Sequence, residues 1–399
     1  MWYYSRMKVT TDEKKIEDIL TRGVEKVYPD KSTLEKVLMS GKKIKLYYGI
    51  DPTGSTLHLG HLVQLLKLKQ FQDLGHEVII LIGDFTAQIG DPTNKQATRK
   101  PLTHRQVLDN AKGYKKQIGK ILDLKKLNVR FVYNEKWTNK LTPGDMLELA
   151  SHFTVSNLLT RNMFQERIKT GREVHAHEFL YPIFQAYDAV SLDVDLQIGG
   201  NDQMFNMLAG RDLMKKKNNK EMFVLTTKLL IDSTGKKMGK TEKNMITLND
   251  SANDIFGKIM SWSDKMLALG FEICTNLTFN DFIKENPRDQ KMRLAYEIVK
   301  IYHGEKKGKE AEENFVNTFQ KKEIPETIDE IKGNLGEMLS EVLVRNKVLS
   351  SKGEWRRLVL ENAVHNLSKK ENITDVNLKI SEGSVLKIGK KRFIKIVQN

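Results

Sequence analysis

The clearest pattern of hydrophobic and polar positions lies between residues 45 and 91. A short apolar run, Leu46–Ile50, is bounded by polar residues and predicts a buried strand. Helical spacing of apolar residues follows at Leu62–Leu74 and stops at Gly75. A second apolar run, Val78–Ile82, predicts another strand. This order of strand, helix and strand is typical of a βαβ unit, in which the two strands run parallel.

The same alternation continues along the chain. Further strands are predicted at Val129–Tyr133, Leu192–Ile198 and Phe223–Leu230, and helices at Arg105–Leu124, Met146–Thr170 and Gln203–Lys217. The spacing within residues 11–43 predicts two leading helices. Strands that alternate with helices favour an α/β fold with a doubly wound, Rossmann-like parallel sheet.

Beyond Lys243 the apolar spacing becomes almost entirely helical, and near the end of the chain it changes again. Val385–Ile388 and Arg392–Val397 flank Gly389 and predict a terminal hairpin. The predicted domains are an α/β domain with its N-terminal helices (1–243), an α-helical domain (244–320), a linker (321–340) and a small α+β domain (341–399).

The net charge of the chain adds information about possible binding partners. The 399 residues carry a formal charge of +15, which fits either a polyanionic partner or an evenly solvated, lysine-rich surface. Residues 341–399 hold thirteen Lys and Arg against six Asp and Glu. This concentration of positive charge favours a nucleic-acid contact there.

Other classes of protein are disfavoured by the sequence. The single cysteine, Cys274, excludes an internal disulfide framework and a cysteine-based zinc site. No apolar run is long enough to predict a membrane span, and the first residues do not resemble a secretory signal. We therefore expect a cytoplasmic protein, and we assign no role to Met1–Arg6.

Two histidines, His58 and His61, lie at the predicted start of the first βαβ helix, with Gly60 between them. A helix N-terminus with imidazoles and a backbone-exposing glycine suits the binding of phosphate groups. A chance pair or a metal site is the alternative. The metal alternative lacks an evident carboxylate or cysteine ligand nearby, so no metal site is predicted from these residues.

The sequence motifs at and around these histidines resemble those of a known family. His58-Leu59-Gly60-His61 looks like the HIGH signature of class I aminoacyl-tRNA synthetases, and YYGIDPT and IGDPTNK resemble the bacterial tyrosyl type. The stretch from Lys236 to Thr241 looks like the KMSKS loop of that class. Residues 341–399 resemble an S4-type RNA-binding domain. Met204 and Phe205 depart from the family, many members of which have Trp-Gly there.

The resemblance implies roles for individual residues. The expected catalytic set, which binds the phosphates and the ribose, is Thr53, His58, His61, Lys95, Arg99, Lys237, Lys240 and Thr241. Further ATP contacts are expected from Gly49, Asp51, Gly60, Gly200, Asp202 and Lys240. The expected tyrosine contacts are Tyr47, Asp91, Tyr181, Gln185, Asp188 and Gln203.

Helical spacing supports part of the amino-acid site. Tyr181, Gln185 and Asp188 lie at positions i, i+4 and i+7, so a helix places them on one face. An ordinary amphipathic helix is the alternative, but the apolar residues around this row leave no obvious solvated stripe. By resemblance, Asp188 and Tyr47 bind the phenolic hydroxyl of tyrosine.

The leading hypothesis is a tyrosine–tRNA ligase that uses ATP and Mg²⁺, charges tRNA(Tyr) and forms a homodimer, all as the resemblance implies. Carboxylate activation by ATP needs alignment and charge stabilisation rather than a general base. Two alternatives stay open: the tryptophanyl enzyme, which shares these signatures, and an RNA-binding protein that has kept the synthetase scaffold without catalysis.

Overall fold

A computed structural model describes residues 9–93, 102–238, 245–319, 329–369, 371–380, 384–389 and 392–398. The chain divides into two compact units, Met1–Lys309 and Glu310–Asn399. Each unit contains its own sheet. Among the helices of the described ranges, none is long and apolar enough to cross a membrane. The domain boundaries predicted at 243 and 320 stay predictions.

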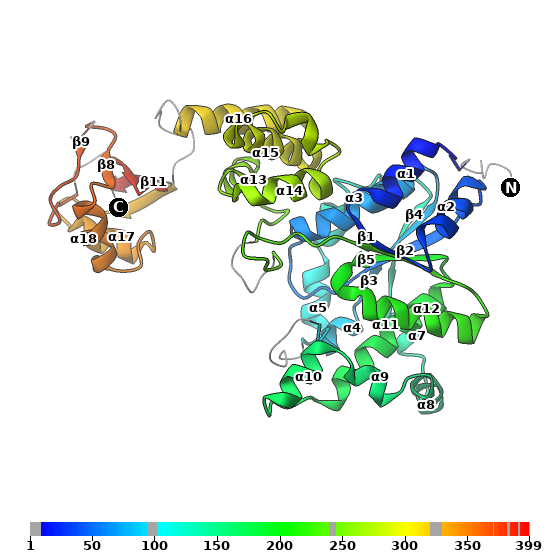
Figure 1. The fold of residues 1–399 in the computed structure, drawn as a ribbon. Helices are drawn as coiled ribbons and strands as arrows, with labels where there is room; N and C mark the ends of the chain where they lie inside the picture. Colours follow the sequence, from blue (N-terminus) through cyan, green and yellow to red (C-terminus); the bar gives the residue numbers. More distant parts are fainter. Residues whose placement is uncertain are drawn as a thin grey trace. The chain divides into compact units, whose positions relative to one another are not determined.

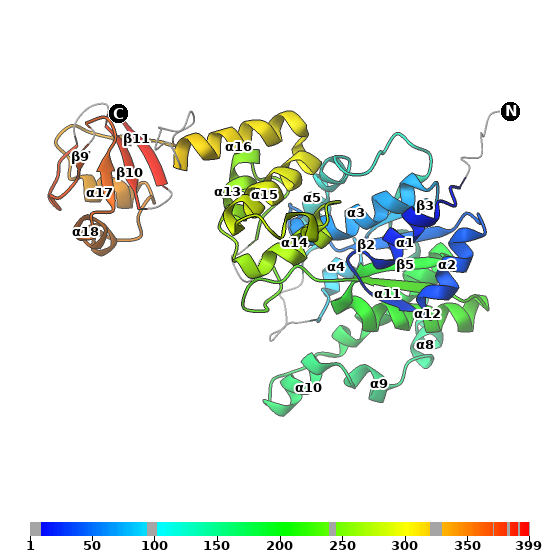
Figure 2. The same cartoon turned by 45° about the horizontal axis from the view of Figure 1, so that its top comes forward.

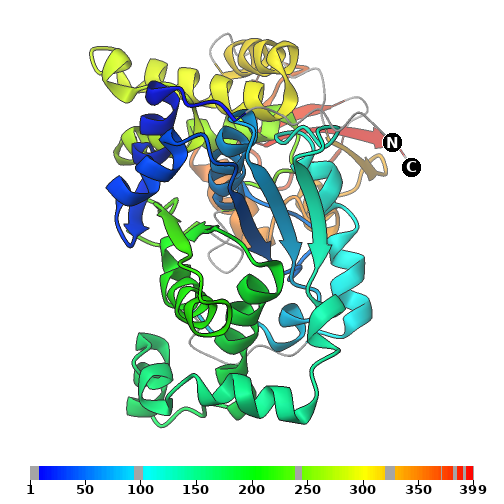
Figure 3. The ribbon, with the colours of Figure 1, turned by 90° about the vertical axis from the view of Figure 1, so that its right-hand side faces the viewer.

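The first unit is organised around a six-stranded sheet with the order β1-β6-β5-β2-β3-β4. Its strands are β1 (Val24–Tyr28), β2 (Lys45–Ile50), β3 (Glu77–Ile82), β4 (Val129–Tyr133), β5 (Leu196–Gly200) and β6 (Phe223–Thr227). The strands from β2 to β6 pair in parallel, and Figure 3 shows them side by side. The predicted Rossmann-like parallel sheet is therefore confirmed.

The edge strand β1 was not predicted. The helical spacing of apolar residues predicted from residues 11–43 includes Val24 and Val27. In the structure these residues form a strand that pairs antiparallel with β6. Gly23 adopts a φ of 63°, which ends the preceding helix and turns the chain toward the sheet edge. The two leading helices are present on either side of β1, as α1 (Glu13–Thr21) and α2 (Lys31–Met39).

Helices cover both faces of this sheet (Figure 1). One face packs against α11 (Leu180–Leu192) and α12 (Met204–Asn218) through a buried apolar cluster that includes Tyr47, Leu81 and Ile183. The other face carries α3 (Leu59–Asp73), which follows β2 directly. This arrangement places the N-terminus of α3 and several residues of α11 at the carboxyl edge of the sheet.

Two long helical predictions are divided into shorter helices. Residues 105–124 form α5 (His104–Ala111) and α6 (Tyr114–Ile118), which Gly113 separates. Residues 146–170 form parts of α8 (Pro143–Ser151), α9 (Val155–Leu159) and α10 (Asn162–Lys169). The short helices α4 (Thr86–Ile89) and α7 (Glu135–Thr138) follow β3 and β4.

The helical segment after the sheet is present as predicted. It contains α13 (Ala252–Met260), α14 (Leu267–Cys274), α15 (Pro287–His303) and α16 (Glu305–Phe319). The chain that leads into it is tied to the start of α3, because Leu59 donates its N–H to Ile246 and Leu248 donates to Leu57, at 3.0 and 2.8 Å.

The second unit has a five-stranded sheet with the order β7-β11-β10-β8-β9. Its elements are β7 (Asp329–Gly333), α17 (Leu339–Arg345), α18 (Lys352–Leu360), β8 (Val364–Asn366), β9 (Glu371–Asn372), β10 (Val385–Ile388) and β11 (Arg392–Gln398). Figure 2 shows its strands with α17 and α18 on one side. The predicted hairpin is confirmed as β10 and β11, with Gly389 at a φ of 64°.

One boundary of this unit differs from the prediction. The segment 329–333 had been assigned to the linker, but β7 pairs in parallel with β11 and buries Ile331. Its sequence is rich in charge because the strand lies at the edge of the sheet, where alternate side chains face solvent. The unit therefore includes residues from at least 329 onward.

Candidate active site

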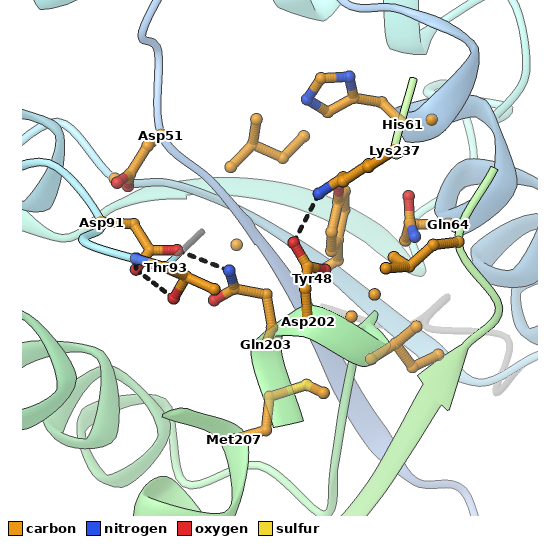
Figure 4. Close-up of a pocket in the computed structure, with 18 of the residues that line it drawn as sticks. Tyr48, Asp51, His61, Gln64, Asp91, Thr93, Asp202, Gln203, Met207 and Lys237 are labelled. Atoms are coloured by element: carbon orange, nitrogen blue, oxygen red, sulfur yellow. Dashed lines mark hydrogen bonds and ion pairs between the residues drawn. The ribbon is translucent and has the colours of Figure 1, made fainter. Parts of the chain in front are cut away.

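A cavity of about 820 Å³ lies at the carboxyl ends of β2 and β5 (Figure 4). Every predicted site residue that the structure describes lines it: Tyr47, Gly49, Asp51, Thr53, His58, Gly60, His61, Asp91, Tyr181, Gln185, Asp188, Gly200, Asp202, Gln203 and Lys237. Lys95, Arg99, Lys240 and Thr241 lie outside the described residues. The roles of these side chains stay predictions, but their convergence on one cavity is a structural finding.

The two histidines form the N-terminal cap of α3. His58 accepts a hydrogen bond from the Gly60 N–H through Nδ1 at 3.1 Å, and the His58 N–H donates to Nδ1 of His61 at 3.2 Å. A Cβ atom on Gly60 would lie 2.8 Å from the His58 ring, so a side chain there would displace the imidazole. Imidazoles and a helix N-terminus together suit a phosphate group.

A basic and an acidic residue meet beside these histidines. Lys237 Nζ lies 2.6 Å from Oδ2 of Asp202, which follows the glycine-rich end of β5. The turn before Lys237 requires Gly235, which adopts a φ of 81°. The predicted pyrophosphate ligand and the predicted ribose ligand are thus paired with each other.

Asp188 lies at the buried part of the cavity and is 2% exposed. Its carboxylate accepts hydrogen bonds from Trp137 Nε1 at 2.8 Å and from Asn134 Nδ2 at 3.1 Å. Burial raises the pKa of Asp188 to about 8, although these two hydrogen bonds act in the opposite direction. The carboxyl group therefore changes its charge near neutral pH.

Tyr47 belongs to the same part of the cavity. It is fully buried, and its hydroxyl has no hydrogen-bond partner among the described residues. Burial raises the pKa of Tyr47, and the charge of Asp188 adds to this effect. A buried hydroxyl left unsatisfied beside a buried carboxylate costs free energy. A ligand hydroxyl bound between them would recover that cost.

Asp51 connects two regions of the cavity. Tyr181 donates its hydroxyl proton to Oδ2 of Asp51 at 2.9 Å, and Thr86 donates to Oδ1 at 2.7 Å. The hydroxyl of Thr86 also accepts from Asn134, a partner of Asp188, at 3.1 Å. Asp51 had been predicted as an ATP contact, and the structure shows it bonded to a residue predicted to bind tyrosine.

Asp91 is held from two directions. Gln203 Nε2 donates to its Oδ2 at 2.6 Å, while the N–H and the hydroxyl of Thr93 donate to its Oδ1 at 2.9 and 2.6 Å (Figure 4). Gln185, also predicted to contact the amino acid, has a buried Oε1 atom without a hydrogen-bond partner among the described residues. These groups are suited to bind an ammonium group.

Sequence analysis missed several residues of the site. Asn134 and Trp137 hold Asp188, and Gln64 lines the cavity while donating to Thr227 at 2.8 Å. Asn134 directly follows β4, and residues that follow parallel strands meet at one edge of the sheet. That position was the available signal for Asn134, whereas nothing in the spacing indicated Trp137 or Gln64.

Among the described residues, Asp84, His104 and Glu135 place possible metal-ligand atoms within 4.8 Å of one another. His104 Nε2 lies 2.6 Å from Oε2 of Glu135, and Asp84 accepts the Glu135 N–H at 2.9 Å. Because these groups already bind one another, we assign no metal to them.

Comparison with known proteins shows the family to which the chain belongs. The family model for class I tRNA synthetases (W and Y) matches residues 39–320. The chain belongs to this family. A tyrosine–tRNA ligase from Carboxydothermus hydrogenoformans is 42% identical over 95% of this chain and 97% of its own length. One from Thermotoga maritima is 39% identical over 97% of this chain and 98% of its own length.

Solved structures of the family show the same fold. A truncated mitochondrial tyrosyl-tRNA synthetase from Coccidioides posadasii has a TM-score of 0.62 with 22% identity, over 76% of this chain and 92% of that chain. A tyrosyl-tRNA synthetase from Archaeoglobus fulgidus, solved with L-tyrosine, has a TM-score of 0.57 with 19% identity, over 75% and 99%. At these identities the likeness concerns the fold alone.

Proposed function

We propose that this protein is a tyrosine–tRNA ligase, which forms tyrosyl-adenylate and pyrophosphate from tyrosine and ATP and then transfers tyrosine to the terminal adenosine of tRNA(Tyr). The relatives that match it over nearly its whole length carry that activity in their names. The observation that carries the proposal is the shared cavity. It joins the His58–His61 pair, which suits phosphate, to the buried Asp188, which suits a phenol.

In this proposal each reactant occupies its own part of the cavity. The phosphates of ATP lie against His58, His61 and Thr53, and the ribose lies against Asp202 after Lys237 has left it. The tyrosine carboxylate then attacks the α-phosphorus, and pyrophosphate leaves. The protein aligns the reactants and stabilises the developing negative charge, so no general base is needed. Lys95, Arg99, Lys240 and Thr241 remain proposed phosphate ligands on the strength of the family motifs.

Asp188 and Tyr47 favour tyrosine over tryptophan. An indole offers a single N–H donor and no acceptor, so a bound tryptophan would leave the buried Tyr47 hydroxyl unsatisfied. Phenylalanine offers neither a donor nor an acceptor and would leave it unsatisfied as well. Asn134 and Trp137 reinforce this selection because their hydrogen bonds fix the carboxylate of Asp188 in one orientation.

Mg²⁺ is proposed as a companion of ATP rather than as a resident ion. The lining carboxylates are already engaged, since Asp51 accepts from Tyr181 and Thr86 while Asp202 pairs with Lys237. The residues present therefore fit an Mg²⁺ ion that is held mainly by phosphate oxygens and water. The ion would neutralise charge on the departing pyrophosphate.

The remaining partners are also proposals. The basic residues 341–399 would bind tRNA(Tyr), together with the helical segment that follows the sheet of the first unit. A homodimer is proposed from the resemblance to the family, and the exposed apolar residues Leu147, Val155 and Ile168 on α8, α9 and α10 are candidates for its interface. The protein would act in the cytoplasm, where tRNA is charged for translation.

The substitution Asp188→Ala tests the proposal. We expect it to reduce tyrosine-dependent ATP–pyrophosphate exchange at least about 100-fold, because it removes the proposed partner of the phenolic hydroxyl and leaves the buried donors of Asn134 and Trp137 without their acceptor. Binding of tRNA should be unchanged. The exposed Asp281→Ala serves as the matched control. Unchanged exchange in Asp188→Ala would show that Asp188 does not bind tyrosine and would reject the proposed amino-acid site. Absence of exchange in the wild-type protein would favour an RNA-binding protein without catalysis.

A further inference from the structure

Arg161 is a buried arginine that sequence analysis did not select. It precedes α10 as the N-cap residue, and its side chain is 4% exposed. The guanidinium lies against two aromatic rings, 5.6 Å from the centre of Phe164 and 5.0 Å from the centre of Phe205. Phe205 is one of the positions at which the sequence differs from the resembled family, and in the structure its ring packs against Arg161.

The guanidinium reaches the site through Thr93. Arg161 Nη2 donates to the Thr93 hydroxyl oxygen at 2.5 Å, and this hydroxyl donates to Oδ1 of Asp91 at 2.6 Å. A hydroxyl group has one proton, so accepting from Arg161 commits that proton to Asp91. Hydrogen bonds in such a chain polarise one another, and a charged donor at its start strengthens the link.

Both carboxylate oxygens of Asp91 are therefore held in place. Arg161 Nη2 lies 3.7 Å from Oδ1 of Asp91, on the same side as Thr93, while Gln203 holds Oδ2 at 2.6 Å. Gln203 is itself oriented, because its Oε1 accepts from Asn206 at 3.0 Å. Figure 4 shows Asp91 between Thr93 and Gln203 at the wall of the cavity.

Stability alone does not explain an arginine at this position. Burial lowers the pKa of Arg161, and the charge of Asp91 only partly opposes that shift. Its Nη1 is buried and has no hydrogen-bond partner among the described residues. An apolar side chain of similar length would fill the space between Phe164 and Phe205 without a desolvation cost. The charge therefore has a use beyond packing.

We propose that Arg161 is a positioning residue for the amino-acid substrate: through Thr93 it holds Asp91 in the orientation that binds the α-ammonium group. The proposal rests on the proposed function, in which Asp91 meets that ammonium. Arg161 does not contact the substrate, and it does not line the cavity. It affects the binding of the α-ammonium group and leaves the binding of the phenol and of ATP unchanged.

Two fragments of the substrate separate this role from a structural one. Tyramine keeps the phenol and the amine, whereas 3-(4-hydroxyphenyl)propionate keeps the phenol and the carboxylate but lacks the amine. Dissociation constants are measured by calorimetry for the wild-type protein, Arg161→Met, Arg161→Lys and the exposed control Arg288→Met. For Arg161→Met we expect tyramine to bind about 10–100-fold more weakly, which is the range of one to two charge-assisted hydrogen bonds.

The other arms of the experiment give distinct results. In Arg161→Met, binding of the propionate and the KM for ATP should each change less than about threefold, and Arg161→Lys should restore part of the tyramine affinity. Thr93→Val replaces the hydroxyl that accepts from Arg161 and donates to Asp91 with a methyl group of similar size. It should therefore reproduce the selective loss, and it provides a second variant if Arg161→Met folds poorly.

Three results would overturn the proposal. Equal weakening of both fragments in Arg161→Met and Thr93→Val would indicate a structural role, and unchanged tyramine binding would show that Asp91 does not depend on Arg161. If the wild-type protein bound neither tyrosine nor tyramine, the proposed function itself would fail. That third result is seen before any variant is compared, so the two failures are distinguishable.

Discussion

Lys237 and Asp202 form an ion pair of 2.6 Å across the nucleotide part of the cavity. The lysine is 45% exposed and the carboxylate 9%, so the pair lies at the mouth of the site. In the proposed reaction the ribose of ATP meets Asp202 and its phosphates meet Lys237, so binding of ATP would separate these two residues. Part of the binding free energy of ATP would then be spent on breaking this contact.

The first prediction follows from that exchange of partners. Lys237→Met should change the KM for ATP less than about threefold, because the interaction it loses with ATP is offset by the ion pair it no longer has to break. The rate of adenylate formation should fall about 30–100-fold, since one charge-assisted contact to the leaving pyrophosphate is worth about 2–3 kcal/mol. Rapid-quench kinetics measure both quantities.

The exposed Lys112→Met is the matched control, and its kinetics should equal those of the wild type. A large increase in the KM for ATP with an unchanged rate constant for Lys237→Met would mean that the lysine binds the ground state, which contradicts the account.

The parts of the fold that the sequence predicts are those in which local pattern and tertiary structure agree. Leu46–Ile50 and Val78–Ile82 are continuous apolar runs because parallel strands are buried on both faces. Val24 and Val27 fit a helical spacing although they belong to an edge strand. No residue of this strand is fully buried, so it lacks the continuous apolar run of a central strand. Its pairing with β6 depends on residues about 200 positions away, which no local spacing records.

The site shows the same division. Residues within recognisable words, such as His58 and Asp188, were found, and all of those that are described line one cavity. Asn134, Trp137 and Arg161 were missed because each acts on a residue far away in the chain. Their function arises from three-dimensional proximity, and an isolated asparagine, tryptophan or arginine carries no motif.

The second prediction concerns Gly83, which follows β3. A Cβ atom there would lie 2.1 Å from Oδ1 of Asp51 and 2.4 Å from the Thr86 hydroxyl. Gly83→Ala should therefore displace Asp51 from Tyr181, raise the KM for tyrosine at least about tenfold and destabilise the fold by about 1–3 kcal/mol. Steady-state exchange kinetics and urea unfolding measure these effects.

Gly257 in α13 offers a matched control. No described atom lies within 4 Å of the position that its Cβ would occupy, and its backbone is helical. Gly257→Ala should leave exchange unchanged and stabilise the protein by about 0.5–1 kcal/mol. Similar behaviour of the two variants would contradict the crowding argument at Gly83.

The third prediction links Asp188 to the pH dependence of stability. Its pKa is raised to about 8 in the folded protein, from 3.8 ordinarily, so between these values the folded state binds more protons than the unfolded state. Stability contributed by the protonated carboxyl is therefore lost as pH rises toward 8. Asp188→Asn removes this penalty, and its free energy of unfolding relative to wild type should increase by about 1–3 kcal/mol between pH 5 and 9.

Urea unfolding at both pH values measures the change, with the exposed Asp281→Asn as the control. The same variant should lose tyrosine activation, so that stability and activity move in opposite directions. A difference between variant and wild type that does not depend on pH would show that burial does not control this carboxyl.

The fourth prediction concerns the C-terminal unit. Removal of residues 329–399 should leave tyrosine-dependent exchange within about threefold of wild type, because the cavity is built entirely from residues of the first unit. Aminoacylation of tRNA should fall at least about tenfold, as expected when several phosphate contacts are lost. The cut precedes β7, since a deletion from 341 would leave that strand without β11. Equal loss of both activities would contradict this separation of roles.

One cavity is proposed to activate an amino acid with ATP and to select it by a phenolic hydroxyl. The decisive measurement is ATP–pyrophosphate exchange with tyrosine, phenylalanine and tryptophan. We expect rapid exchange with tyrosine, much slower exchange with phenylalanine and none above background with tryptophan. Exchange driven by tryptophan but not by tyrosine, or equal exchange with tyrosine and phenylalanine, would contradict it.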